Sequence, residues 1–89
     1  MITDKEKKII LKIAKKYNVS KIMLFGSGLD NTIESNDIDI AVEGIPNKDF
    51  YSFYGELIFA LSKPIDVIDM SIKSKFIDLI RKEGILLDA

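Results

Sequence analysis

The segment from Asp37 to Glu43 constrains the fold more than any other part of the chain. It alternates at period two, with Asp37, Asp39 and Ala41 at one parity and Ile38, Ile40 and Val42 at the other. Successive side chains of a strand point to opposite faces of a sheet, so this pattern predicts a strand with one apolar face and one acidic face. Such a strand must join a sheet with a covering layer, which the rest of the chain has to supply.

The flanking sequence predicts three helices, two more strands and a short tail. Apolar residues at helical spacing predict helices at Asp4–Tyr17, at Asn47–Leu61 and from Ser71 or Ser74 to Glu83. The residues expected to face inward are Phe50, Phe53, Tyr54, Leu57, Ile58 and Leu61 in the second helix and Ile72, Phe76, Ile77 and Ile80 in the third. Short apolar runs bounded by turn residues predict strands at Ile22–Phe25 and Ile65–Met70. The tail Ile85–Leu87 is expected to pack on the sheet.

Several residues are suited to the ends of these helices. Thr3 and Glu6 have the spacing of a capping box before the first helix, and Asn18 can adopt the left-handed conformation after it. Asn47 is expected to cap the second helix, and Gly84 to stop the third.

The order of elements predicts an α/β fold with a small mixed sheet and helices packed on it. The passage from Asp37–Glu43 through a helix to Ile65–Met70 should join two parallel strands in a right-handed crossover. The connection from Ile22–Phe25 to Asp37–Glu43 is shorter and poor in helix-forming residues, so that pair is predicted to be antiparallel.

Composition excludes several kinds of chemistry. The 89 residues include no cysteine and no histidine, which rules out thiolate nucleophiles, histidine acid–base catalysis and Cys- or His-ligated zinc.

The net charge of −1 argues against a nucleic-acid-binding protein. No apolar run approaches the ~20 residues that a membrane-spanning helix needs. We therefore expect a cytoplasmic protein with no membrane partner.

The predicted topology brings three carboxylates and a Gly-Ser turn to one edge of the sheet. Asp37 and Asp39 begin one strand, and Asp66 begins its parallel neighbour. The antiparallel first strand ends at the same edge with Gly26 and Ser27. Asp69 is a rival for the third carboxylate, but it lies an odd number of positions from Asp66 and so on the opposite face. We favour Asp66 because it lies nearer the expected edge of the sheet.

Clustered carboxylates repel one another without a counter-charge. At about 4–5 Å and an effective dielectric constant of about 20, two of them repel by about 3–4 kcal/mol. A divalent cation relieves this repulsion, and an all-oxygen ligand set favours Mg²⁺ or Mn²⁺. Mg²⁺ held by carboxylates and substrate phosphates is typical of nucleotidyl transfer. Gly26 allows close backbone approach, and N–H groups around Ser27 can bind a phosphate oxygen.

These residues resemble the signature of the DNA polymerase beta superfamily of nucleotidyltransferases, and especially its minimal, MNT-type members. The motif is Leu24–Ser27 followed, after a polar loop, by Asn36–Val42. Pro64–Ile68 is similar to the strand carrying the family's third carboxylate, and Ile80–Leu87 to its C-terminus. The likeness covers nearly the whole chain and implies that residues 1–89 form a single minimal nucleotidyltransferase domain.

The resemblance implies a role for each matching residue. Gly26 and Ser27 would hold a nucleoside triphosphate, while Asp37 and Asp39 would coordinate two metal ions. Asp66 would complete the second metal site and help to activate the attacking hydroxyl. The implied reaction moves a nucleoside monophosphate, AMP from ATP, to a hydroxyl acceptor. The resemblance also implies a small helical HEPN-type toxin as protein partner and acceptor, in a toxin–antitoxin pair; homo- or hetero-oligomers are both compatible with it.

The loop after Ser27 keeps a second function open. Family members usually have ten residues between Gly-Ser and the first aspartate, and many have an arginine there. This chain has nine, Gly28–Asn36, with neither lysine nor arginine. The loop favours an inactive antitoxin or binding module that neutralises its partner by direct contact, whereas the three aspartates favour the enzyme. A metal or nucleotide sensor, or a merely structural role for Asp37 and Asp39, are the remaining alternatives.

Two surface features are also ambiguous. The first 21 residues carry seven lysines and two acidic residues. This excess predicts either a solvated helix face or a contact with an acidic or nucleic-acid partner. An aromatic residue left exposed by the second helix, such as Tyr51, would mark an interface.

Overall fold

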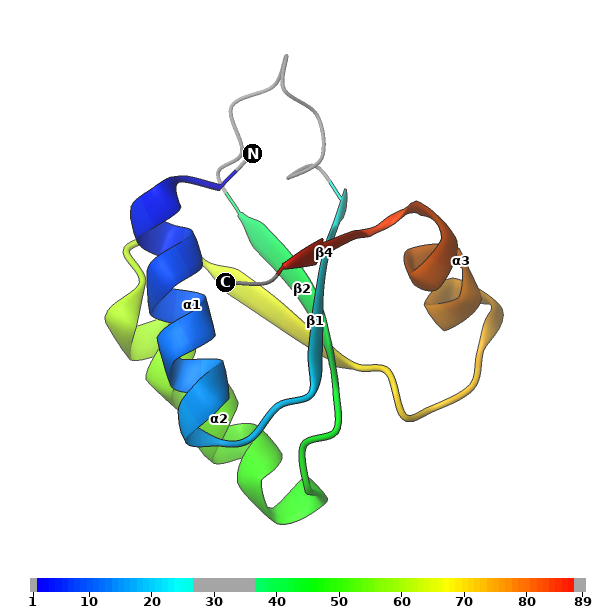
Figure 1. The fold of residues 1–89 in the computed structure, drawn as a ribbon, viewed down its shortest axis with the longest axis horizontal. Coiled ribbons are helices and arrows are strands. Elements are labelled where there is room, and N and C mark those ends of the chain that lie inside the picture. The colour runs from blue at the N-terminus through cyan, green and yellow to red at the C-terminus, as the bar shows by residue number, and fades with distance from the viewer. Residues whose placement is uncertain (1, 27–36, 88–89) are drawn as a thin grey trace.

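The computed structural model describes residues 2–26 and 37–87. Its helices and strands follow one another in the predicted order (Figure 1). They are α1 (Asp4–Lys16), β1 (Lys21–Phe25), β2 (Ile38–Glu43), α2 (Asn47–Ala60), β3 (Ile65–Asp69), α3 (Lys75–Glu83) and β4 (Ile85–Leu87).

The strands form one four-stranded mixed sheet in the order β3-β2-β1-β4. β1 pairs with β2 antiparallel and β2 pairs with β3 parallel, which confirms both predicted pairings. The C-terminal tail does more than pack on the sheet. It forms β4, which pairs antiparallel with β1 in the register Ile22 to Leu87. The fold is therefore the mixed α/β arrangement predicted from the sequence.

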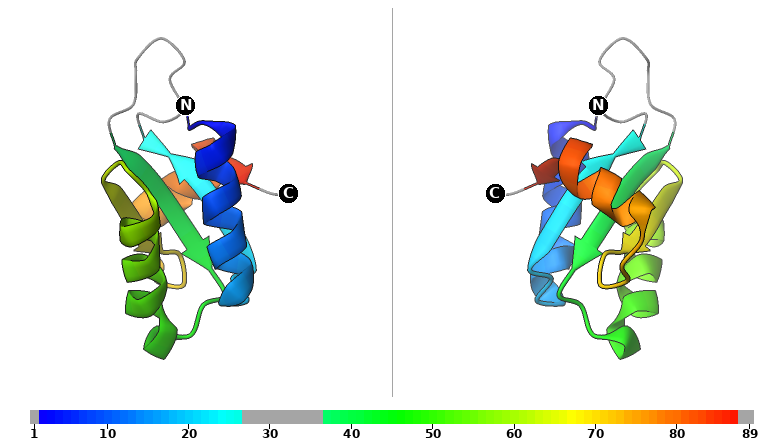
Figure 2. Two further views of the ribbon diagram at one scale, coloured as in Figure 1. Left: turned by 90° about the vertical axis from the view of Figure 1, so that its left-hand side faces the viewer. Right: turned by 90° about the vertical axis from the view of Figure 1, so that its right-hand side faces the viewer.

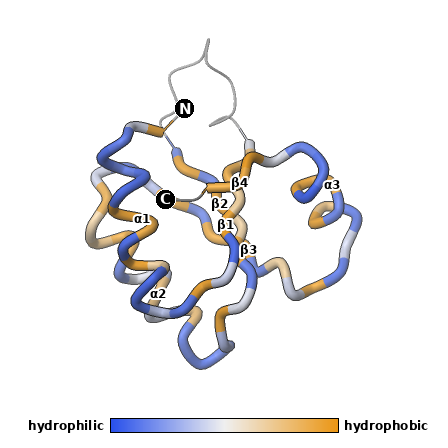
Figure 3. The backbone as a smooth tube through the Cα atoms, in the orientation of Figure 1, coloured by the Kyte–Doolittle hydropathy of each residue, from blue (hydrophilic) through white to orange (hydrophobic). Residues whose placement is uncertain are grey.

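The helices cover the two faces of the sheet unequally, as the side views show (Figure 2). α1 and α2 pack on one face, over a core that includes Ile10, Leu24, Ile40, Phe53 and Leu57. α3 packs on the other face over a smaller core of Met23, Ala41, Met70, Ile77 and Ile80. The hydropathy alternates along the turns of α1, as expected of a helix with one buried face (Figure 3). Among the described residues, no helix is both long and apolar enough to cross a membrane.

Three predicted core positions are wrong. Ile58 of α2 is 58% exposed because the helix buries the stripe through Phe53 and Leu57, and Ile58 lies on its outer side. Ile72 is 66% exposed because it precedes α3, which begins only at Lys75. Phe76 is 49% exposed because the nine-residue helix α3 turns only Ile77 and Ile80 fully inward.

The N-terminal helix caps are partly as predicted. The Glu6 N–H donates to Thr3 Oγ1 at 3.1 Å and the Thr3 N–H donates to Glu6 Oε1 at 2.8 Å, which is the expected capping box. Ser74, rather than Ser71, caps α3. The prediction for Asn47 is wrong because the extended Pro46 occupies the N-cap position, and its carbonyl accepts the Asp49 N–H at 2.9 Å.

The C-terminal ends depend on Asn18 and Gly84. Asn18 has the predicted left-handed conformation, with φ of 57°. Gly84 ends α3 with φ of −70°, so it is not needed for a left-handed turn. Its role is close approach: a Cβ there would lie 2.6 Å from the Ile80 carbonyl oxygen and 3.1 Å from that of Leu24. The glycine therefore lets the end of α3 lie against β1.

Candidate functional site

The sheet brings two of the predicted carboxylates side by side. Asp39 of β2 pairs with Asp66 of β3 in parallel register and with Phe25 of β1 on its other side. Asp37 immediately precedes β2. These positions lie on the face that carries Ala41, the face on which α3 packs. Because α3 covers that face further along the strands, Asp39 is only partly buried and Asp66 is exposed.

Gly26 lies directly against the Asp39 carboxylate. Its φ is +74°, which strains any residue with a side chain, and a Cβ there would lie 2.5 Å from Asp39 Oδ2. Glycine is thus required both by the backbone conformation and by the approach of the carboxylate. The structure brings Gly26 to the predicted site, whereas Ser27 lies outside the described residues.

The carboxylates interact electrostatically. Burial raises the pKa of Asp39, and the nearby charges of Asp66 and Asp37, together with a hydrogen bond to Asp66, raise it further. The ion pairs of the described part of the chain use Glu6, Glu43 and Glu56, so neither Asp39 nor Asp66 is neutralised by a lysine or arginine there. The site therefore carries excess negative charge.

An all-oxygen site with excess negative charge fits a hard divalent cation such as Mg²⁺ or Mn²⁺. Asp39 and Asp66 are adjacent donors for such an ion, and Asp37 is close enough to influence Asp39. Within residues 2–26 and 37–87, however, no three acidic side chains are already grouped as a metal-binding cluster.

Tyr54 is a site residue that the sequence did not reveal. Helical spacing predicts Tyr54 on the apolar face of α2, but its hydroxyl donates to the Ile65 carbonyl oxygen at 3.0 Å and lies 3.4 Å from Asp66 Oδ1. The ring thus links α2 to the start of β3. Its position at helical spacing from Phe50 and Leu57 indicates only burial, so no sequence signal distinguishes the hydroxyl.

Asp69, the rival third carboxylate, has a different environment. It is the last residue of β3, in register with Val42, three positions from Asp66. Its Oδ1 accepts the backbone N–H of Ser71 at 2.9 Å, which stabilises the turn that follows the strand. Asp69 therefore has a structural role on the side of the sheet opposite to Asp66.

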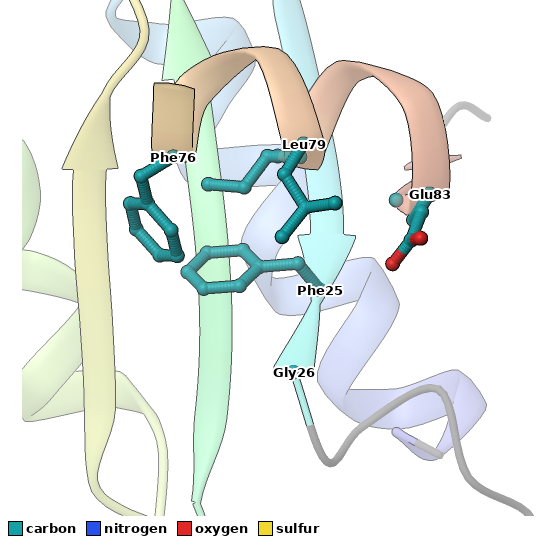
Figure 4. A pocket seen from close by; sticks show the side chains of 7 residues that line it. Phe25, Gly26, Phe76, Leu79 and Glu83 are labelled. Atoms are coloured by element: carbon teal, nitrogen blue, oxygen red, sulfur yellow. The ribbon is translucent and has the colours of Figure 1, made fainter. Parts of the chain in front are cut away.

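An apolar cavity adjoins the carboxylates at the end of β1 (Figure 4). It measures about 250 Å³ and lies between Phe25 and Gly26 on one side and α3 on the other. Phe76 and Leu79 extend from α3 toward the Phe25 ring, and the Glu83 carboxylate lies at the far end of the helix (Figure 4). The sequence does not indicate this cavity, because helical spacing predicts that Phe76 is buried.

Comparison with protein families identifies the class to which this fold and site belong. Residues 7–88 match the family model described as polymerase beta, nucleotidyltransferase. The mixed sheet, its helices and the paired aspartates agree with that match. The chain belongs to the polymerase beta nucleotidyltransferase family.

Several solved structures with the same fold come from toxin–antitoxin complexes. A toxin–antitoxin structure with AMP-PNP is 27% identical, with a TM-score of 0.74 over 93% of this chain and 73% of the other. A variant of the MntA-HpeT pair is 26% identical, with a TM-score of 0.70 over 98% and 73%. A tri-AMPylated HEPN toxin in complex with MNT antitoxin, from Shewanella oneidensis, has a TM-score of 0.75 over 99% and 73%. At 23% identity this last likeness concerns the fold alone. No curated protein matches the chain.

Proposed function

We propose that the protein is a metal-dependent nucleotidyltransferase that moves AMP from ATP to a hydroxyl group on a HEPN-type toxin. The observation that carries this proposal is the pairing of Asp39 and Asp66 beside Gly26 in a member of this family. The 27% identical complex contains AMP-PNP, which supports adenosine triphosphate as the nucleotide. Two neighbours above 25% identity are toxin–antitoxin structures, which supports a toxin as the partner.

The proposed site assigns a task to each acidic residue. Asp37, Asp39 and Asp66 would hold Mg²⁺ or Mn²⁺, which would supply charge stabilisation for the phosphates. Gly26 leaves room for the triphosphate beside Asp39, and the backbone at Ser27 would bind a phosphate oxygen. The acceptor oxygen bonds to the α-phosphorus, pyrophosphate leaves from the opposite side, and Asp66 accepts the hydroxyl proton.

A second candidate function is neutralisation of the toxin by binding without transfer. The feature that favours it is the Gly28–Asn36 loop, which contains Asp30 and Glu34 but no lysine or arginine to offset phosphate charge. A protein of this kind would retain the fold and the contact with its partner after the carboxylates were removed.

Transfer of label distinguishes the two candidates. The protein is incubated with Mg²⁺, the product of the adjacent gene and ATP labelled at either the α- or the γ-phosphate. Nucleotidyl transfer labels the partner from α-labelled ATP only, whereas phosphoryl transfer would use the γ-label. We expect Asp39→Asn to abolish labelling and Asp69→Asn, on the opposite side of β3, to retain it.

The remaining outcomes exclude one candidate or the other. Labelling that survives in Asp39→Asn would exclude the assigned site. No labelling by the wild-type protein, combined with a stable complex and a neutralised toxin, would support the binding function instead.

A further inference from the structure

The apolar cavity between β1 and α3 has features that neither the carboxylates nor the core accounts for. Phe76 and Leu79 are 49% and 47% exposed, although both are large apolar side chains. The Phe25 and Phe76 rings meet edge to face, with centroids 5.7 Å apart. Together they leave an open aromatic and aliphatic surface beside the site (Figure 4).

This cavity is continuous with the candidate site. Phe25 is the register partner of Asp39, and Gly26, which lies against the Asp39 carboxylate, also lines the cavity. A ligand that contacts Asp39 through a charged group can therefore place an apolar ring on Phe76 without leaving the protein surface.

The size and lining of the cavity favour one ring system. Its volume of about 250 Å³ lies below the roughly 300–1,000 Å³ typical of pockets that enclose a whole ligand. Its surface is mainly apolar, and Glu83 adds a carboxylate that can accept a hydrogen bond from an amino group. Planar bases stack on aromatic side chains, and this stacking tolerates different bases.

We infer that this cavity holds the nucleobase of the triphosphate, with Phe76 and Leu79 as its stacking surface and Glu83 as an acceptor for an exocyclic amino group. The inference rests on the proposed function, because the phosphates are taken to lie at Gly26 and Asp39. In this arrangement α3 recognises the base, although α3 contributes no carboxylate to the metal site.

The packing of α3 against the sheet explains why the side chains of Phe76 and Leu79 are available to a ligand. Gly84 lets the end of α3 lie against β1, since a Cβ there would collide with the Ile80 and Leu24 carbonyl oxygens. Ile77 and Ile80 anchor the helix in the core. The half-exposed Phe76 and Leu79 are thus held on a fixed helix, which suits them for contact with a ligand.

The test compares two ligands that differ in the base. Binding of ATP and of inorganic triphosphate, each with Mg²⁺, is measured by calorimetry for the wild-type protein, Phe76→Ala, Leu79→Ala and Ile72→Ala. Ile72 is the matched control because it is also an exposed apolar residue next to α3 but does not line this cavity. Circular dichroism confirms that each variant is folded.

We expect Phe76→Ala to weaken ATP binding by at least about fivefold, the lower end of the effect of removing one aromatic stacking side chain. Leu79→Ala removes only an aliphatic contact and should weaken ATP binding by a smaller factor. Triphosphate binding should stay unchanged in both variants, and Ile72→Ala should match the wild type for both ligands. In Glu83→Gln the preference for ATP over UTP, whose base lacks an amino group, should fall.

Each contrary result leads to a different conclusion. Unchanged ATP affinity in Phe76→Ala and Leu79→Ala overturns the inference, as does equal loss of ATP and triphosphate. If these variants lose toxin binding while ATP affinity is unchanged, the cavity belongs to the protein partner. A wild-type protein that binds ATP and triphosphate equally well overturns this inference alone, whereas one that binds neither overturns the proposed function as well.

Discussion

Asp39 and Asp66 are register partners on adjacent parallel strands and project from the same face of the sheet. In the described part of the chain neither is offset by an ion pair, and burial together with the charge of Asp66 raises the pKa of Asp39. The two residues therefore contribute an unfavourable interaction to the folded state. Such an interaction is retained where function needs it, and its removal should stabilise the protein.

Replacing Asp39 by asparagine should raise stability while abolishing transfer. The bare repulsion between neighbouring carboxylates is screened by solvent at this partly exposed site, so we expect a gain of about 1 kcal/mol. For a domain of this size that corresponds to a Tm increase of about 4–8 °C. Thermal unfolding at pH 7 in EDTA measures it. The control Asp69→Asn should show no gain, and a destabilised Asp39→Asn would contradict the assigned repulsion.

Divalent cations should stabilise the wild-type protein through the same pair. A ligand that binds only the folded state at one hundred times its Kd adds about 2.7 kcal/mol. We expect Mg²⁺ or Mn²⁺ to raise Tm in the wild-type protein and in Asp69→Asn, but much less in Asp39→Asn or Asp66→Asn. Sodium chloride at matched ionic strength controls for screening. Equal shifts in all four proteins would indicate a general salt effect rather than a site.

The sequence allowed the sheet to be predicted further than the site. The alternation around Asp39 determined which face is acidic, and the lengths of the connections determined which strands are parallel. Neither kind of pattern identifies a side chain that contacts two elements of secondary structure in different ways. Tyr54 contributes an apolar ring at helical spacing and a hydroxyl near Asp66, and only the first of these has a periodic signal.

The exposed apolar residues of the helices were also not fully predictable from the sequence. Periodicity indicates which residues can face inward, but the length of the covering helix decides how many do. Phe76 has the right spacing for burial, yet α3 buries only Ile77 and Ile80 fully. Tyr51 is 81% exposed, as expected of an aromatic residue left outside the core. Its role at an interface stays a prediction, because exposure alone does not identify a partner.

Replacing Gly26 by alanine should impair both folding and transfer. The positive φ and the contact of a Cβ with Asp39 Oδ2 each oppose the substitution. Backbone strain of this kind costs about 1–3 kcal/mol. The control is Gly55→Ala on α2, where an added Cβ meets nothing within 4 Å. It should stabilise the helix by about 0.5–1 kcal/mol. Urea unfolding measures both variants, and equal effects would contradict the strain at Gly26.

Replacing Tyr54 by phenylalanine should lower the rate of transfer more than it lowers ATP affinity. The change removes the hydroxyl that joins α2 to Ile65 and approaches Asp66, but it keeps the ring. Loss of the hydrogen bond should cost about 1 kcal/mol of stability. Tyr51→Phe, on the exposed side of α2, is the matched control and should leave both properties unchanged. A decrease in ATP affinity that equals the decrease in kcat would contradict a positioning role for Tyr54.

Ionised Glu6 should stabilise the folded protein, and this stabilisation should be lost at acid pH. Burial opposes its ionisation, but hydrogen bonds from Thr3 and the charge of Lys63, whose Nζ lies 3.4 Å from Glu6 Oε2, outweigh burial and lower its pKa. A carboxyl with a lower pKa in the folded state stabilises the protein above its unfolded pKa. That contribution is lost as the pH falls through the folded pKa.

Glutamine at position 6 separates this charge effect from the helix cap. Glutamine can still form a capping box with Thr3, so Glu6→Gln removes mainly the charge and its attraction to Lys63. We expect a loss of about 0.5–1 kcal/mol at pH 7, comparable to a charge at a helix N-terminus, and a smaller difference at pH 3. Urea unfolding at both pH values measures it, with Asp4→Asn in the exposed first turn as the control. A difference that persists undiminished at pH 3 would assign the effect to the cap rather than to ionised Glu6.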